Sequence, residues 1–176
     1  WHIAGLAWAH PSAARLRGGI TAALGVALAV AFASYNAADP SLNSASMAEP
    51  RNALGGAGAL LADLGVQSLG LAAGVAAVVM VVLGLSRAAA TDPDACRAHL
   101  RLRAAAGLGG VICLGAVLAA PTPPAAWPLA RGLGGFWGDQ ALHALAGVLA
   151  FAHIPFANVL AALILLPPAV LGVGYG

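Results

Sequence analysis

The sequence predicts an all-α polytopic membrane protein, with four transmembrane helices and amphipathic helices in the loops on one side. Of the 176 residues, 61% are hydrophobic and only 8% are charged, whereas a soluble domain carries roughly 25% charged residues. The mean hydropathy is +0.89. The apolar residues form four long runs, and about 20 helical residues cross a bilayer core of roughly 30 Å. Such a chain cannot cover itself with a water-facing surface.

The first predicted span covers residues 18–35 and follows Arg15 and Arg17. We expect residues 1–17 to form a cytoplasmic or interfacial segment, and residues 18–176 to form the four-helix domain. A signal peptide is the alternative for this span, because Ala31-Phe32-Ala33 fits a cleavage site. The chain continues past that site, which favours a retained span.

A long polar stretch, residues 34–63, follows the first span. Tyr35 is placed like an aromatic anchor at a membrane interface. Asp39-Pro40-Ser41 predicts a turn, because proline fixes φ while Asp and Ser bond to nearby backbone. Asn52 could cap a helix that begins near Leu54. The polar stretch is therefore expected to be an ordered, outward-facing loop that ends in a helix.

The second predicted span covers residues 64–85 and contains Gly70-x-x-x-Gly74. Small residues at this spacing let helix backbones approach closely in a membrane. We expect Gly70 and Gly74 to pack against another helix, although such a match also arises by chance in a chain with 23 glycines. Gly84 lies near the end of this span, where substitution is expected to be milder.

The segment 86–103 is predicted to be a solvated basic loop, with a short helix beginning at Asp92-Pro93-Asp94. The segment indicates the orientation of the chain in the membrane, because arginines accumulate on the cytoplasmic side of membrane proteins. The sequence has no lysine, and six of its eight basic residues flank the predicted spans on one side. These six are Arg15, Arg17, Arg87, Arg97, Arg101 and Arg103. Both ends of the chain are therefore expected on the cytoplasmic side.

The third predicted span, residues 104–120, ends at a proline-rich segment that begins the second outward-facing loop. Residues 133–152 have one apolar face but also several polar side chains, which predicts a helix that lies on or dips into the membrane. Pro155 separates it from the fourth span, residues 156–175. We expect Pro167 and Pro168 to kink that span.

Few residues point to chemistry. Without any lysine the chain has no Walker-type phosphate loop, so we expect no nucleotide cofactor in it. Asp139 and His143 are four residues apart and could pair on one helix face; a hydrogen-bonded pair is favoured over a metal or proton site. Cys96 and Cys113 are expected in a loop and in a span, too far apart to form a disulfide.

Two motifs stand out in the outward-facing segments. The first runs from Ser34 to Asp63 and the second from Gly132 to Asp139. Their characteristic positions are Tyr35, Asn36, Asp39, Pro40, Ser41, Gly55, Gly58, Asp63, Gly134, Gly135, Gly138 and Asp139. With these motifs, and with the order of hydrophobic segments across residues 15–176, the chain resembles the four-helix membrane domain of the FtsK/SpoIIIE DNA translocases, and its alphaproteobacterial branch in particular.

The resemblance implies an inner-membrane anchor at the division septum of a bacterium. It also implies a cytoplasmic RecA-like motor, absent from this chain, which would use ATP and magnesium, assemble as a hexamer and pump chromosomal DNA. The partners implied are the lipid bilayer, further copies of the chain and other division proteins, with DNA bound only through the motor. The chain starts without methionine and stops within its fourth apolar run, so we expect a piece of a longer protein.

Two other functions stay open on the sequence. A small transporter subunit would place charged or broken helices at mid-membrane, and an accessory subunit of a larger membrane complex would be selected for helix packing alone. The spacings Gly55-x-x-Gly58 and Gly135-x-x-Gly138 match. They suggest that the chain contains two similar helical hairpins, although coincidence in so glycine-rich a chain is the alternative.

Overall fold

The computed structural model describes residues 10–42, 44, 47–90, 93–129 and 132–176, without the side chains of 93–98. Regular structure in these residues is α-helical, which confirms the predicted fold class. The helices are α2 (Pro11–Ala33), α3 (Gly55–Leu69), α4 (Ala72–Ala89), α5 (Pro93–Ala119), α6 (Gly135–Phe151) and α7 (Ala157–Tyr175). The expected N-terminal segment is described only from His10, and the side chain of Cys96 lies outside the described residues.

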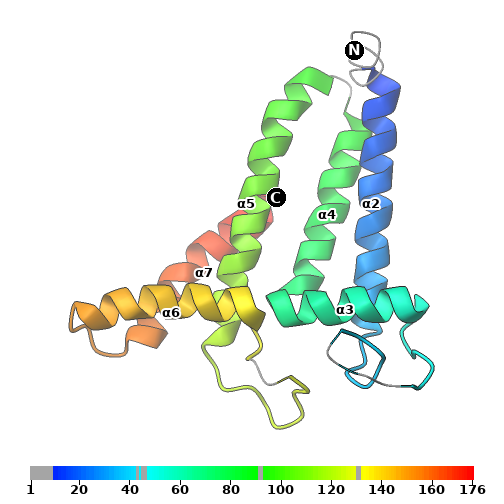
Figure 1. Ribbon diagram of the computed structural model, residues 1–176. Helices are drawn as coiled ribbons and strands as arrows, with labels where there is room; N and C mark the ends of the chain where they lie inside the picture. Colours follow the sequence, from blue (N-terminus) through cyan, green and yellow to red (C-terminus); the bar gives the residue numbers. More distant parts are fainter. Residues whose placement is uncertain (1–9, 43, 45–46, 91–92, 130–131) are drawn as a thin grey trace.

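Four segments are long and apolar enough to cross a bilayer. They are Pro11–Ala33, Ala72–Ala89, His99–Ala119 and Ala157–Tyr175. The other two helices, α3 and α6, lie roughly end to end across one end of α2, α4 and α5 (Figure 1). The helix predicted at 133–152 is confirmed as α6, and α3 is its counterpart in the first half of the chain.

Two predicted boundaries were wrong. Residues 64–85 are not one span, because α3 ends at Leu69, Gly70 adopts φ +60°, and α4 begins at Ala72. The segment 86–103 is not a loop either, since α4 continues to Ala89 and α5 begins at Pro93. Proline suits the first turn of a helix, where its missing N–H has no partner to lose. The third span is thus the end of a 27-residue helix.

The two halves of the chain have the same order of elements, as the matching glycine spacings suggested. In each half a spanning helix is followed by a helix across the end of the bundle and by a second spanning helix. The most extensive helix contacts are those of α2 with α4 and of α5 with α7. Gly55 and Gly135 each begin the crosswise helix with a positive φ, +64° and +63°. This aligns Gly55 with Gly135 and Gly58 with Gly138.

Glycines set the distance between the spanning helices. A Cβ on Gly84 would lie 2.8 Å from the Cα of Ala22 and from the carbonyl oxygen of Gly18. Gly172 faces Gly110 in the same way in the other half, with 2.7 Å between its added Cβ and the partner Cα. Close backbone approach is how helices associate in lipid, where apolar burial gives little drive. Gly84 is therefore a packing residue between α2 and α4, which the sequence did not indicate; that its substitution is milder than that of Gly70 stays a prediction.

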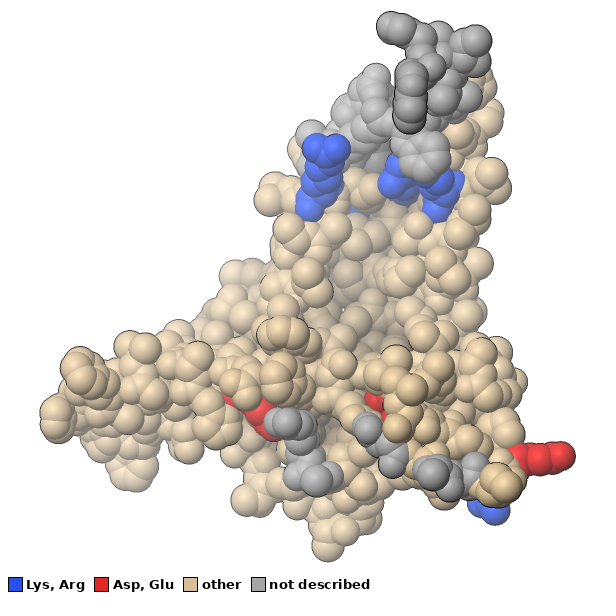
Figure 2. Space-filling view, viewed as in Figure 1, with Lys and Arg blue, Asp and Glu red and all other residues tan. Residues whose placement is uncertain are grey.

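Charged side chains separate along the length of the bundle. Most basic side chains gather at the end away from α3 and α6, and acidic ones lie near α3 and α6 (Figure 2). Arg51, in the loop before α3, is the exception among the described residues. We call the first the arginine-rich end; its described members are Arg15 and Arg17 in α2, Arg87 in α4, and Arg101 and Arg103 in α5. This distribution matches the arginine asymmetry expected from the sequence.

Candidate functional site

A buried polar cluster, formed by Ser34, Asp39 and Asn52, organises the loop between α2 and α3. Asp39 and Asn52 are each only 4% exposed. The carboxylate of Asp39 accepts hydrogen bonds from the backbone N–H groups of Arg51 and Asn52, both at 2.9 Å. Hydrogen bonds to an ionised acceptor are about twice as strong as neutral ones. Asp39 thereby closes a loop of more than ten residues.

Asn52 connects the end of α2 to the start of α3. Its amide nitrogen donates to the carbonyl oxygens of Ala31 at 2.8 Å and Ser34 at 3.3 Å. Its amide oxygen accepts from the N–H of Leu54 at 3.1 Å, which forms a turn just before α3. The predicted cap was wrong, because Leu54 is the residue that precedes the helix and α3 has no side-chain cap. A Cβ on Gly58 would collide with this amide oxygen. Gly58 is therefore needed to leave room for the Asn52 side chain.

The other motif residues of this loop also bond to backbone. The hydroxyl of Ser34 accepts from the N–H of Ala53 at 3.1 Å. Asn36 accepts from the N–H of Ala38 at 3.0 Å, and Ser41 accepts from the N–H of Ser44 at 3.2 Å. Pro40 lies between Asp39 and Ser41 in the predicted turn region. The polar groups of the motif thus form hydrogen bonds that stabilise the shape of the loop.

Tyr35 differs from the interfacial anchor that the sequence suggested. Its hydroxyl is buried, as is one carboxylate oxygen of Asp63, and neither makes a hydrogen bond of standard geometry within the described residues. Burial raises the pKa of the Tyr35 phenol, and the nearby charge and side chain of Asp63 raise it further. Tyr35 therefore faces α3 with its phenol held in the neutral form.

A second cluster, which we call the glycine junction, joins the two halves of the molecule. It consists of Gly70, Gly115, Gly134, Gly135 and Gly138. The N–H of Leu71 donates to the carbonyl oxygen of Leu133 at 2.9 Å. A Cβ on Gly70 would collide with that same oxygen, and one on Gly135 would lie 2.8 Å from the backbone nitrogen of Leu69. The end of α3 and the start of α6 therefore meet backbone to backbone.

Gly138 and Gly134 bring α6 against α5. A Cβ on Gly138 would lie 2.9 Å from the Cα of Gly115, and one on Gly134 would collide with the carbonyl oxygen of Gly115. Gly74, by contrast, has no atom within 4 Å of an added Cβ. The predicted Gly70/Gly74 packing pair was wrong, because the two glycines do not share a helix and only Gly70 is in close contact.

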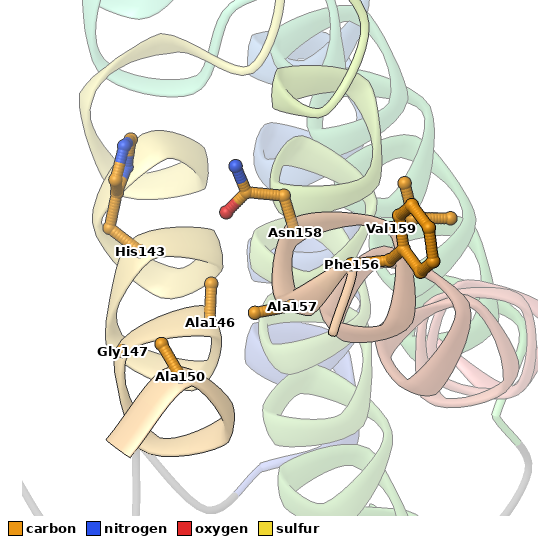
Figure 3. Close-up of a pocket in the computed structure, with 8 residues that line it drawn as sticks. All are labelled: His143, Ala146, Gly147, Ala150, Phe156, Ala157, Asn158 and Val159. Carbon is orange, nitrogen blue, oxygen red and sulfur yellow. The ribbon is translucent and has the colours of Figure 1, made fainter. Parts of the chain in front are cut away.

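Asp139 and His143 interact through the backbone and not through the carboxylate. The Nδ1 atom of His143 lies 2.7 Å from the carbonyl oxygen of Asp139. His143 also lines an open groove of about 550 Å³ between α6 and α7. Figure 3 shows His143 and Asn158 on opposite sides of this groove, which is otherwise apolar. No group of three metal-ligating side chains occurs within the described part of the chain.

Arg103 is a structural residue that sequence reasoning missed, since it was counted only for topology. Its Nε donates to the carbonyl oxygen of Tyr175 and its Nη2 to that of Gly176, both at 3.0 Å. Its Nη1 donates to the Ser86 hydroxyl at 3.1 Å. One guanidinium thus ties α5 to the end of α7 and to α4. The contact of Gly115 with α6 was not predicted either, because it depends on Gly134 and Gly138, which are distant in the sequence.

These clusters fix the shape of the domain. The polar side chains of the first cluster form hydrogen bonds to backbone groups. The glycine junction brings the backbones of α3, α5 and α6 into close contact. Together they hold α3 and α6 across one end of the four spanning helices. The arrangement is that of a membrane domain whose two halves meet at the glycine junction and along α4 and α5.

Comparison with known proteins agrees with this architecture. The family described as the 4TM region of DNA translocase FtsK/SpoIIIE matches residues 15–172. The chain is similar to the DNA translocase FtsK of Caulobacter vibrioides, with 50% identity over 175 residues, which are 99% of this chain and 21% of that protein. It is also 38% identical over 151 residues to the DNA translocase FtsK of Rhizobium meliloti, covering 85% of this chain and 17% of the relative.

A third relative, the DNA translocase FtsK of Mesorhizobium japonicum, is 38% identical over 141 residues, or 77% of this chain and 15% of the relative. No solved structure matches the chain. The chain spans about a fifth of the length of the curated relatives that it matches. With a family match across nearly its whole length and four candidate membrane spans, the chain belongs to the FtsK/SpoIIIE family and is its four-helix membrane region.

Proposed function

We propose that this chain anchors a septal DNA translocase in the bacterial inner membrane and takes part in cell division and chromosome segregation. The observation that carries the proposal is the family match over residues 15–172 together with the four candidate spans. The matched relatives are named DNA translocases and are about five times as long as this chain. We assign the pumping of DNA, which would use ATP and magnesium, to a separate motor domain outside residues 1–176.

The orientation in this proposal follows from the charges. The arginine-rich end faces the cytoplasm, because basic residues are retained on that side during insertion. The polar cluster and the glycine junction then face the periplasm, together with α3 and α6. Since DNA lies on the other side, these motif residues serve the shape of the anchor and its contacts with other division proteins. Assembly as a hexamer would bring six such anchors together.

A fluorescent fusion of residues 1–176 in dividing cells tests the proposal. We expect a band at the division site, because the anchor carries the contacts with the division proteins. The matched control is the same fusion with Glu49→Ala, which alters an exposed residue of the same loop and should leave the band unchanged. Uniform membrane fluorescence from the unaltered fusion would contradict the septal anchor and favour an accessory subunit of another complex.

A further inference from the structure

A pocket of about 280 Å³ lies at the arginine-rich end, where the two halves of the molecule face each other. Three helices contribute to it: α2, α4 and α5. Its lining consists of Thr21, Leu83, Gly84, Arg87, Leu100, Arg101 and Ala104. Two of these residues are cationic and the others are apolar or small, so the pocket combines positive charge with an apolar wall.

The two arginines of the pocket differ from Arg103 in their contacts with the described residues. Arg87 lies in the last turn of α4, and Arg101 lies in α5 two residues before the structural Arg103. Within the described residues, neither Arg87 nor Arg101 makes a hydrogen bond or an ion pair, in contrast to Arg103 with its three hydrogen bonds. Their guanidinium groups can therefore donate hydrogen bonds to an anion in the pocket.

The position of the pocket relative to the bilayer indicates which kind of anion it would bind. Arg87 lies in the last turn of α4, two residues before Ala89. Long arginine side chains near the end of a spanning helix extend to the membrane interface, so its guanidinium can reach the headgroup layer. Leu83, Leu100 and Ala104 line the same pocket and offer an apolar surface for acyl chains.

We propose that this pocket is a binding site for an anionic phospholipid, with Arg87 and Arg101 holding the headgroup phosphate. Basic pockets between transmembrane helices bind acidic lipid headgroups in this way. The bond of Arg103 to Ser86 holds α5 against α4 beside the pocket. A lipid there would contact both halves of the molecule, far from the glycine junction that joins them at the other end. The site needs only a headgroup layer at this end and is independent of the septal localisation proposed above.

Native mass spectrometry of the purified chain tests the site, with phosphatidylglycerol and phosphatidylcholine added in separate arms. We expect the unaltered chain to retain phosphatidylglycerol in preference to phosphatidylcholine. The double variant Arg87→Gln/Arg101→Gln is expected to lose affinity for phosphatidylglycerol by on the order of tenfold or more. Arg15→Gln is the matched control, because Arg15 is exposed at the same end but does not line the pocket; its affinity should stay within about twofold.

Two further measurements distinguish loss of charge from loss of fold, and binding of a lipid from binding of free phosphate. Arg87→Lys/Arg101→Lys keeps both charges and should retain most of the binding, which separates loss of charge from loss of fold. Inorganic phosphate is tested for protection against thermal unfolding, and we expect it to protect far less than phosphatidylglycerol. Equal binding of the two lipids, unchanged binding by the glutamine variant, or equal protection by phosphate would each overturn the proposal.

Discussion

Asp39 shows how much structure one buried carboxylate can hold. It lies in a loop of an otherwise apolar chain, and it accepts two backbone hydrogen bonds from residues 12 and 13 positions later. Without it, two N–H groups beside the buried Asn52 would lose their partners. Leaving a buried donor unsatisfied costs about 1–3 kcal/mol. The family motif at this position therefore has a physical reason that does not involve catalysis.

Asp39→Ala is predicted to lower the free energy of unfolding by about 1–3 kcal/mol, since the buried N–H of Asn52 is orphaned, whereas the N–H of the exposed Arg51 can bond to water. The measurement is denaturant-induced unfolding of the chain in detergent, followed by circular dichroism. Glu49→Ala is the matched control in the same loop, because Glu49 is exposed, and it should change stability by less than about 0.5 kcal/mol. Equal losses for the two variants would show that Asp39 does not close the loop.

At the level of the elements, hydropathy and proline positions predicted four spans and the helix α6. The break at Gly70 could not be predicted in this way, because residues on both sides of it are apolar and no proline intervenes. The break depends on Leu133, more than 60 residues away, whose carbonyl oxygen accepts from Leu71. Similarly, charge composition favoured a loop at 86–103, while the structure has helix through most of it.

The Gly70 break leads to a prediction with an internal control. Gly70 adopts φ +60° and ψ −139°, a conformation open only to glycine, and a Cβ there would meet the backbone of residues 133 and 134. Gly70→Ala should therefore cost more than about 2 kcal/mol, combining backbone strain with the steric clash. Gly74 is helical with open space around it, so Gly74→Ala should be neutral or stabilising by up to about 1 kcal/mol.

Thermal unfolding of the two variants in the same detergent measures this difference. Equal midpoints for Gly70→Ala and Gly74→Ala would mean that the contact between the end of α3 and the start of α6 is not rigid. The same measurement distinguishes the structure, in which only Gly70 is in close contact, from the sequence-based interpretation, which treated both glycines as one packing pair.

For the candidate site, sequence motifs identified the residues but not their partners. Asp39, Asn52 and Gly58 were all noted, yet their mutual contacts depend on how the loop folds back onto α2. The glycines of the second motif were likewise noted, while their contacts with Gly115 in α5 were not predicted. Pairing of this kind needs coordinates, because no local pattern encodes which backbone will lie opposite a glycine.

On the scale of the whole molecule, the separation of charges predicts the orientation in the membrane. Basic side chains gather at one end and α3 and α6 lie at the other (Figures 1 and 2). Arginine in short loops is retained on the cytoplasmic side, whereas acidic residues contribute little to orientation. Both ends of the chain should therefore be cytoplasmic, with the polar cluster and the glycine junction outside.

Single-cysteine labelling with a membrane-impermeant maleimide measures this orientation, after Cys96→Ser and Cys113→Ala remove the native thiols. Glu49→Cys and Ala89→Cys are a matched pair, because both positions are exposed and they lie toward opposite ends of the bundle. We expect Glu49→Cys to react in intact cells whose outer membrane admits the reagent, and Ala89→Cys to react only after lysis. The reverse pattern would place the arginine-rich end outside, contrary to the charge argument, and would remove the proposed anchor from a cytoplasmic motor.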